Sequence, residues 1–144
     1  MEISRPIKRM FIWLVVALLL QACSEKVPEL KVKEENGKFY VDLNNSSHRR
    51  MEIVGGAKLG IPPNFESIQW HVSSGERALG QCAFADADIE PVYIDPGKSR
   101  RMSLKKSILE RVFCVPDGDY TVRVSYVHGE ESVYSNEIRV KNER

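Results

Sequence analysis

Three cysteines and three histidines are the side chains of this 144-residue sequence best suited to chemistry. The histidines, His48, His71 and His128, lie far apart, and no HExxH pair that could bind zinc is present. None of the serines lies in the Gly-x-Ser-x-Gly turn that carries a hydrolase nucleophile. A catalytic triad assembled from distant loops remains an alternative, since the members of such triads are not neighbours in sequence. The sequence therefore favours a protein that is not an enzyme.

Two acidic runs raise the question of a bound metal, because hard cations such as calcium need clustered oxygen ligands. One run comprises Asp86, Asp88 and Glu90, and the other comprises Asp117 and Asp119. Neither has the spacing of an EF-hand or a Gly at its sixth position, and no Gly-rich phosphate loop occurs. We interpret both runs as solvated loops, and the sequence predicts neither a metal ion nor a cofactor.

The pattern of residues at the start of the chain indicates a different role for Cys23 than for the other two cysteines. An uninterrupted apolar run of eleven residues, 10–20, follows the basic residues Arg5, Lys8 and Arg9. A basic start and an apolar run of this length are typical of a secretory signal peptide, and the run is shorter than the roughly 20 residues of a membrane-spanning helix. The chain is therefore expected to be exported.

The signal ends at Leu20-Gln21-Ala22-Cys23, and these four residues resemble the lipobox of bacterial lipoproteins. The resemblance covers residues 1–23. It implies that residues 1–22 are removed, that the Cys23 thiol carries diacylglycerol, and that the new amine is acylated, with palmitate as the expected chain. The alternative is an ordinary signal peptide whose cleavage site contains a cysteine.

Ser24 bears on the destination of such a lipoprotein. In the proteins that the sequence resembles, Asp at this position tends to retain the chain at the inner membrane, so Ser24 implies the outer membrane, on its periplasmic face. Residues 23–29 are the expected lipidated cysteine and tether, whose polar part spans only about 20 Å when fully extended. The folded domain, residues 30–144, should lie close to the membrane.

Removal of the signal changes the net charge from +1 to −1, because it contains three of the 21 basic residues and one of the 20 acidic ones. This balance excludes a strongly basic nucleic-acid binder. The segment 98–111 is nevertheless basic, and Arg101 and Lys105 are expected on the solvent face of one strand. The favoured interpretation is an edge strand whose charges resist edge-to-edge pairing; the alternative is contact with anionic lipid headgroups.

From Leu30 onward, apolar and polar residues mostly alternate, which is the period of a β-strand. Asn36-Gly37 between two such segments predicts a hairpin. A last strand is expected over 133–140, and one helical turn is expected at 107–110, where Ser-x-x-Glu has the spacing of a capping box. About seven short strands predict an all-β fold, a single antiparallel sandwich.

The segment 116–122, Pro-Asp-Gly-Asp-Tyr-Thr-Val, and the later segment 135–140, Ser-Asn-Glu-Ile-Arg-Val, are similar to the final two strands of immunoglobulin-like and fibronectin-III-like domains. The resemblance implies an immunoglobulin-like β-sandwich over residues 30–144. It also implies that Tyr120 is a tyrosine-corner residue, whose hydroxyl bonds to upstream backbone. This fold hosts many unrelated functions, so the resemblance indicates architecture only.

Cys82 and Cys114 remain after lipidation of the first cysteine, in a compartment that oxidises thiols. They are expected to form one disulfide, because no CxxC or Cys/His cluster supports the alternatives of a metal pair or a catalytic thiol. Their order differs from the antibody pattern, since Trp70 precedes Cys82 and Cys114 precedes Tyr120. The bridge should therefore join loops or strand ends and not the two sheets.

Residues 55–66 form the longest irregular stretch and suit a loop that contacts a partner, because Pro62-Pro63 stiffens it. Its apolar residues Leu59, Ile61 and Phe65 would make that contact, or they would cover the open end of the sandwich, which is the commoner arrangement.

These features favour a membrane-anchored, non-enzymatic protein-binding or envelope-assembly module. It would meet another envelope protein through loop 55–66 or through a strand edge, by β-augmentation. The alternatives are an inhibitor of a periplasmic hydrolase, which would use the Pro62-Pro63 loop, and a carbohydrate-binding unit. The latter usually needs several exposed aromatic residues, whereas the mature chain keeps one Trp, Trp70, expected in the core.

Overall fold

The computed structural model describes residues 26–53, 68–83, 91–128 and 130–143, together with Trp13, Val15 and Val16. For His128 the backbone alone is described. Trp13, Val15 and Val16 are helical and exposed, and no helix in the described part of the chain is long and apolar enough to cross a membrane.

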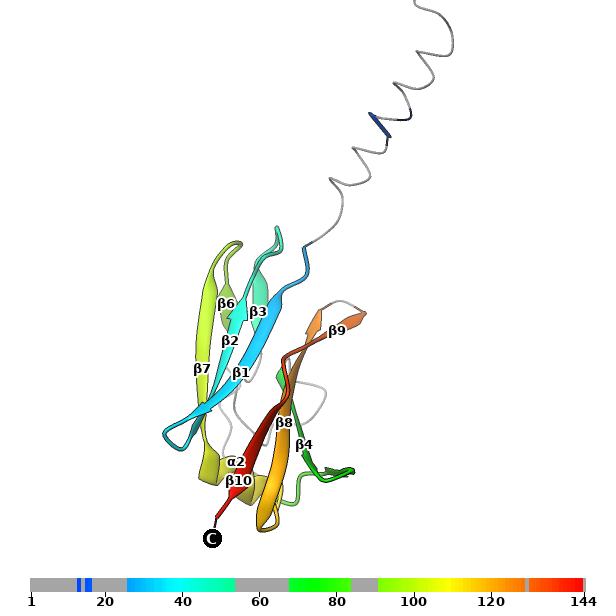
Figure 1. Cartoon of the computed structure of the whole chain (residues 1–144). Helices are drawn as coiled ribbons and strands as arrows, with labels where there is room; N and C mark the ends of the chain where they lie inside the picture. Colours follow the sequence, from blue (N-terminus) through cyan, green and yellow to red (C-terminus); the bar gives the residue numbers. More distant parts are fainter. Residues whose placement is uncertain are drawn as a thin grey trace, which may run out of the picture.

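Alternating apolar residues form two main antiparallel sheets that share one core (Figure 1). The first sheet has the order β1-β2-β7, with bounds Glu29–Glu35, Lys38–Asn44 and Ser99–Lys105. The second has the order β10-β8-β4-β5, with bounds Ile138–Asn142, Gly118–His128, Ile68–Ser74 and Arg77–Leu79, and β9 (Glu131–Tyr134) also pairs with β8. A small third sheet joins β3 (Met51–Ile53) to β6 (Val92–Ile94), and α2 is Lys106–Val112.

The strand order confirms the predicted all-β sandwich. The two sheets have the strand orders of an immunoglobulin-like sandwich. In the letters used for that fold, the first sheet, β1-β2-β7, corresponds to A-B-E, and the second, β10-β8-β4-β5, corresponds to G-F-C-C′. The described residues form ten strands, more than the seven or so expected. Arg77–Leu79 is too short to show a period in the sequence, and the last expected strand is divided in two.

The hairpin between β1 and β2 forms where the sequence predicts it. Asn36 and Gly37 have φ angles of 53° and 71°, which a two-residue turn of type I′ requires, and Glu35 pairs with Lys38 across it. This turn places Phe39, Val41 and Leu43 of β2 on the inner face of the sheet, where all three are fully buried.

The core lies between the two inner faces, and aromatic rings link them. Trp70 of β4 is 8 % exposed, as predicted, and its ring meets that of Phe39 edge-on, with centroids 5.8 Å apart. The indole Nε1 of Trp70 is buried and has no hydrogen-bond partner among the described residues. Leu109 and Val112 of α2 close the core at the end of the sandwich away from the N-terminal segment (Figure 1).

The single strand expected over 133–140 is wrong, because the chain leaves the ladder after Tyr134 and returns at Ile138. Asn136 lies in this break, where its side chain accepts the N–H of Val32 at 3.0 Å and donates to the carbonyl of Val32 at 2.9 Å. It thereby takes the place of a strand partner for β1. One amide side chain thus links an edge of the first sheet to the second sheet.

The helix at α2 occurs where one turn was expected, but the predicted capping box is wrong. The helix begins one residue earlier, at Lys106, directly after β7, and Lys105 at the N-cap position makes no side-chain hydrogen bond. Glu110, the residue expected to complete the box, instead accepts a hydrogen bond from Tyr120. The helix is stabilised by burial of its apolar side and not by a cap.

Candidate functional site

Cys23, the residue expected to be lipidated, lies outside the described residues, and the described chain resumes at Lys26. Val27, which follows, is 51 % exposed, and its carbonyl accepts a hydrogen bond from Ser46 Oγ at 2.7 Å. We call the part of the fold formed by residues 26–27 and by the loops 45–50 and 95–98 the tether end. Any anchor at Cys23 must therefore attach here, within four residues of Val27.

A buried amide builds the loops of the tether end. Asn45 has no exposed surface; its Nδ2 donates to the carbonyls of Arg49 and Ile94, at 2.7 and 2.9 Å. Its Oδ1 accepts from the Oγ and N of Ser47, at 2.6 and 3.1 Å. Its backbone binds the other loop, through N to Lys98 O at 2.9 Å and through O from Gly97 N at 2.7 Å. One residue, through its side chain and its backbone, thus holds both loops.

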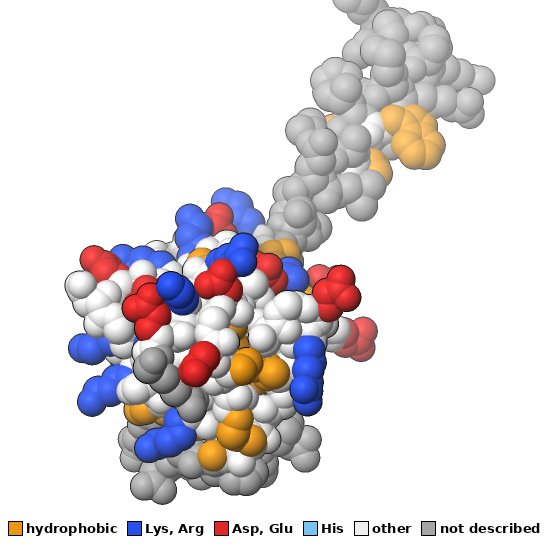
Figure 2. All heavy atoms as spheres, turned by 60° about the horizontal axis from the view of Figure 1, so that its bottom comes forward, with side chains coloured by type: hydrophobic (Ala, Val, Ile, Leu, Met, Phe, Trp, Pro, Cys, Tyr) orange, Lys and Arg blue, Asp and Glu red, His pale blue; other side chains and the backbone are white. Residues whose placement is uncertain are grey.

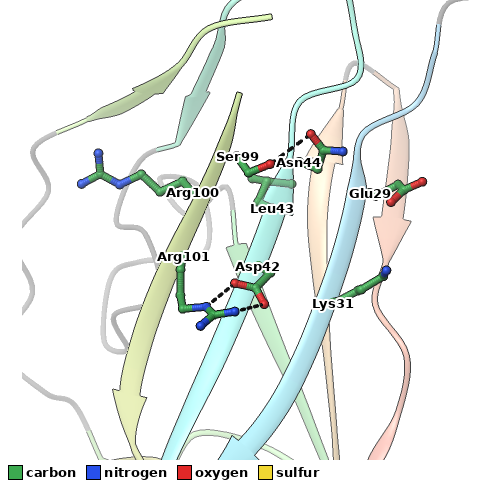
Figure 3. A pocket seen from close by; sticks show the side chains of 8 residues that line it. All are labelled: Glu29, Lys31, Asp42, Leu43, Asn44, Ser99, Arg100 and Arg101. Carbon is green, nitrogen blue, oxygen red and sulfur yellow. Dashed lines mark hydrogen bonds and ion pairs between the residues drawn. The ribbon is translucent and has the colours of Figure 1, made fainter. Parts of the chain in front are cut away.

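Arg101 and Lys105, whose contact with an anionic surface was the alternative interpretation, lie on the solvent face of β7 as expected, but they do not form one site. Arg101 donates from Nε and Nη2 to the two carboxylate oxygens of Asp42, at 2.6 and 2.9 Å (Figure 3). This hydrogen bonding lowers the pKa of Asp42. Lys105 lies beside Lys38 at the opposite end of the sheet. The guanidinium of Arg101 is thus already engaged by an anion of the protein itself.

The Arg101–Asp42 pair lies at one side of an open hollow of about 580 Å³ on the outer face of the first sheet (Figure 3). Glu29 and Lys31 of β1 lie across from it, and Arg100 projects away from the pair at the edge of β7. The lining carries both signs of charge and is shallow, so it lacks the enclosed apolar walls of a small-molecule pocket.

Cys82 and Cys114 form the predicted disulfide, with their Cα atoms 6.1 Å apart. Both residues are exposed, one after β5 and the other after α2, so the bridge joins loops as expected. The backbone N–H groups of Cys82 and Ala83 donate to the carbonyl of Val112, at 2.8 and 3.2 Å. The bridge therefore secures the chain after β5 to the end of the helix.

Tyr120 is buried as a tyrosine-corner residue would be, but its hydrogen bond differs from the prediction. The hydroxyl donates to Oε1 of Glu110 at 3.0 Å, a side chain ten residues upstream, and not to backbone. Burial and then this bond raise the pKa of Tyr120 well above its ordinary value of 10.0. The helix α2 occupies the connection before β8, and its Glu110 supplies the carboxylate that accepts this bond.

Leu59, Ile61 and Phe65, expected either to cover the open end of the sandwich or to contact a partner, lie outside the described residues, as does the whole loop 55–66. The acidic run from Asp86 to Glu90 lies outside them too. In the described part of the chain, no three His, Cys, Asp or Glu side chains lie close enough together to hold a metal ion.

The outer face of the second sheet carries a group of side chains that sequence reasoning missed. His71 of β4 has its Nε2 2.8 Å from Ser125 Oγ of β8, and its ring centroid lies 5.7 Å from that of Tyr134 of β9. The guanidinium of Arg123 lies over the Tyr134 ring, 4.2 Å from its centroid, and its Nε donates to the carbonyl of Ser135 at 3.3 Å. We call His71, Arg123, Ser125 and Tyr134 the aromatic cluster.

The aromatic cluster brings an imidazole, a guanidinium and a phenol ring together on one face of the sheet. The described partners of the His71 ring are a hydroxyl and a tyrosine ring, and neither is the carboxylate that orients a catalytic histidine. Burial and the charge of Arg123 lower the pKa of His71, so the ring is neutral at neutral pH. Ser125 is buried beneath the cluster, whereas Tyr134 is 48 % exposed. In the sequence these residues are isolated, and only strand pairing unites them.

Comparisons of the chain with protein-family models, with curated proteins and with solved structures gave no match. The function must therefore follow from the chemistry of the residues themselves.

Proposed function

We propose that this chain is a bacterial lipoprotein, anchored through Cys23 on the periplasmic face of the outer membrane, whose β-sandwich is a non-enzymatic protein-binding or envelope-assembly module. The lipobox motif supports the anchor. The first strand begins at Glu29, only six residues after Cys23, so the motif leads directly into a folded domain. The aromatic cluster supports the binding role.

The aromatic cluster is the single observation that carries the binding proposal. Tyr and Arg dominate the energetically important positions of protein interfaces, because they offer large contact areas and polar tips. Here Arg123 and His71 flank the ring of Tyr134, so little side-chain freedom remains to be lost on contact. Val127, 42 % exposed, lies on the same face of β8 as Arg123 and Ser125 and enlarges the apolar area.

The anchor is tested by mass spectrometry of the protein purified from its own envelope. We expect a chain that begins at Cys23 and carries diacylglycerol and an acyl group. Cys23→Ala should abolish both modifications and release the protein from the membrane fraction, whereas replacement of Cys82 and Cys114 together should leave the lipid in place. An unmodified Cys23, or cleavage at another residue, would contradict the proposal. Density separation of the two membranes then tests the outer-membrane location.

The binding role is tested by crosslinking in intact cells from a photoreactive residue placed at Tyr134. Tyr40 is the matched control, because it is an aromatic residue on the outer face of the other sheet. We expect one defined crosslinked protein from position 134, none from position 40, and a yield more than about fivefold lower when Arg123→Ala is added. Equal crosslinking from both positions, or no dependence on Arg123, would refute the aromatic cluster as the contact surface.

A further inference from the structure

The tether end carries an excess of basic side chains. Five exposed basic residues lie in residues 26–27, in its loops or in the first residues of β7, and two exposed acidic residues lie near them, for a local charge of +3. The basic residues, which we call the basic rim, are Lys26, Arg49, Arg50, Lys98 and Arg100. The acidic residues are Glu29 and Asp95. A surface of this sign attracts anions.

Most of the basic rim is not neutralised within the protein. The Nε of Arg50 lies 3.4 Å from Oδ1 of Asp95. Its guanidinium carbon lies over the ring of Tyr93, 4.2 Å from the ring centroid. Arg49, Lys98 and Arg100, by contrast, make no ion pair with any other described residue. Their charges therefore remain directed at solvent, or at whatever surface approaches this end.

The loops that carry the basic rim are held in place before any contact is made. Asn45 binds the carbonyls of Arg49 and Ile94 through its amide, and it binds Gly97 and Lys98 through its backbone. Arg49 and Lys98 thus project from backbone that is fixed by hydrogen bonds to the buried residue Asn45. Little ordering of the backbone is required when an anionic surface binds them.

The opposite corner of the same end has the opposite sign. The turn that joins β8 to β9, which lies toward the tether end in Figure 1, carries Glu130 and Glu131, both exposed. A negatively charged surface would attract the loops beside the first sheet and repel this turn. The charge distribution therefore favours a sandwich that is tilted relative to such a surface over one that stands perpendicular to it.

We propose that the basic rim docks the domain onto anionic phospholipid headgroups, with the loops 45–50 and 95–98 against the membrane and the turn between β8 and β9 raised from it. The inference rests on the lipid anchor proposed above. Val27 is the fourth residue after Cys23, a reach of about 14 Å at full extension, so the anchor keeps the basic rim near the headgroups. This docking turns the outer face of the second sheet, with the aromatic cluster, away from the lipid.

The lipidated protein, reconstituted into vesicles, allows a direct test. Amine acetylation followed by mass spectrometry reports the accessibility of each lysine on vesicles of phosphatidylethanolamine with phosphatidylglycerol, and on vesicles of phosphatidylcholine alone. On the anionic vesicles we expect acetylation of Lys98 to slow by about fivefold or more, while Lys141, at the opposite end, is unchanged. High salt should remove the protection, because it screens these charges.

Two charge-matched variants identify the surface. Arg49→Glu with Arg100→Glu should abolish the protection of Lys98 on anionic vesicles. Lys38→Glu with Lys105→Glu reverses two charges at the far end of the first sheet and should leave that protection intact. The docking is overturned if Lys98 is acetylated equally on both vesicle types, or if the far-end variant removes its protection and the rim variant does not. A purified chain without lipid would instead refute the anchor, which mass spectrometry reads independently.

Discussion

The two ends of the sandwich are stabilised in different ways. At the tether end, one buried polar residue, Asn45, joins the two loops through hydrogen bonds of its side chain and its backbone, and no disulfide links the described residues there. At the opposite end, which we call the helix end, α2, the disulfide between Cys82 and Cys114 and the buried Tyr120 form a covalent and largely apolar unit. Hydrogen bonds hold the loops of the tether end in place, whereas a disulfide and apolar packing hold the helix end in place.

The surfaces of the two ends differ as well. In Figure 2, which brings the helix end forward, Lys and Arg side chains are interspersed with Asp and Glu. At the tether end the basic rim dominates one side. Loops fixed by hydrogen bonds can carry exposed charges without large apolar residues, whereas the helix end must bury Leu109 and Val112. The tether end is thus held in place mainly by polar residues, without the apolar packing that the helix end requires.

The largest expected effect comes from removing the covalent link of the helix end. Replacement of Cys82 and Cys114 by Ser opens a loop whose ends are 32 residues apart, and the chain-entropy model gives a loss of about 3–4 kcal/mol in the free energy of unfolding. Denaturant titration measures this loss. Hydrogen exchange should accelerate in α2 more than in residues 45–50, and equal acceleration at both ends would remove the distinction between them.

Asn45→Ala tests the tether end in the same way. The variant leaves the buried carbonyl of Ile94 and the groups of Ser47 without their partner, so we expect a loss of about 3 kcal/mol. Asn44→Ala is the control, because the Asn44 side chain accepts only one exposed hydrogen bond, from Ser99, and should cost about 0.5 kcal/mol or less. If both variants unfold at the same denaturant concentration, the buried amide does not stabilise this end.

The sequence predicted the local features of the fold better than the hydrogen bonds that join residues distant in sequence. Asn36-Gly37 predicted the hairpin because turn chemistry is local, and alternation predicted the inner faces of the strands because the side-chain period is fixed. The break at 135–137 could not be predicted, since the partner of Asn136 lies 104 residues away in β1. Asn45 marks the end of a strand in the sequence, but its burial depends on Ile94, 49 residues distant.

Tyr120→Phe tests a weaker link within the helix end. The variant removes the hydroxyl that donates to Glu110 while it keeps the buried ring, so the free energy of unfolding should fall by about 1 kcal/mol. Tyr40→Phe is the control: its hydroxyl makes no hydrogen bond to a described residue, and its ring keeps its place beside Lys33 and Arg101. A loss for Tyr120→Phe no greater than that of the control would mean that apolar packing alone attaches α2 to β8.

The candidate site shows the same division between local and distant information. The four residues that resemble a lipobox are contiguous, so the sequence alone could raise the hypothesis of a lipid anchor. The pairing of Cys82 with Cys114 could be predicted because only two cysteines remained. The aromatic cluster could not, because His71, Arg123 and Tyr134 come from three strands and no spacing in the sequence marks them. Arg101 was identified as a surface cation, but its engagement with Asp42 depends on the register of β2 and β7.

The smallest expected effect concerns the face between the two ends, and it depends on pH. Burial and Arg123 lower the pKa of His71 below its ordinary value of 6.5, so the unfolded chain takes up this proton before the folded one does. The contribution of His71 to stability is therefore present above about pH 6.5 and is lost as the pH falls below it. Between pH 8 and 5.5 the free energy of unfolding should decrease less in His71→Gln than in the unmodified protein.

NMR titration of the His71 ring separates the two causes of this lowered pKa. Arg123→Gln removes the positive charge and should raise the pKa toward 6.5, while the burial of the ring keeps it somewhat below that value. Arg139→Gln removes an equal charge near the helix end, from a residue paired with Asp119, and should leave the pKa of His71 unchanged. A pKa at or above 6.5 in the unmodified protein would contradict the cluster geometry, because a ring packed between Ser125 and Tyr134 beside a guanidinium must resist protonation.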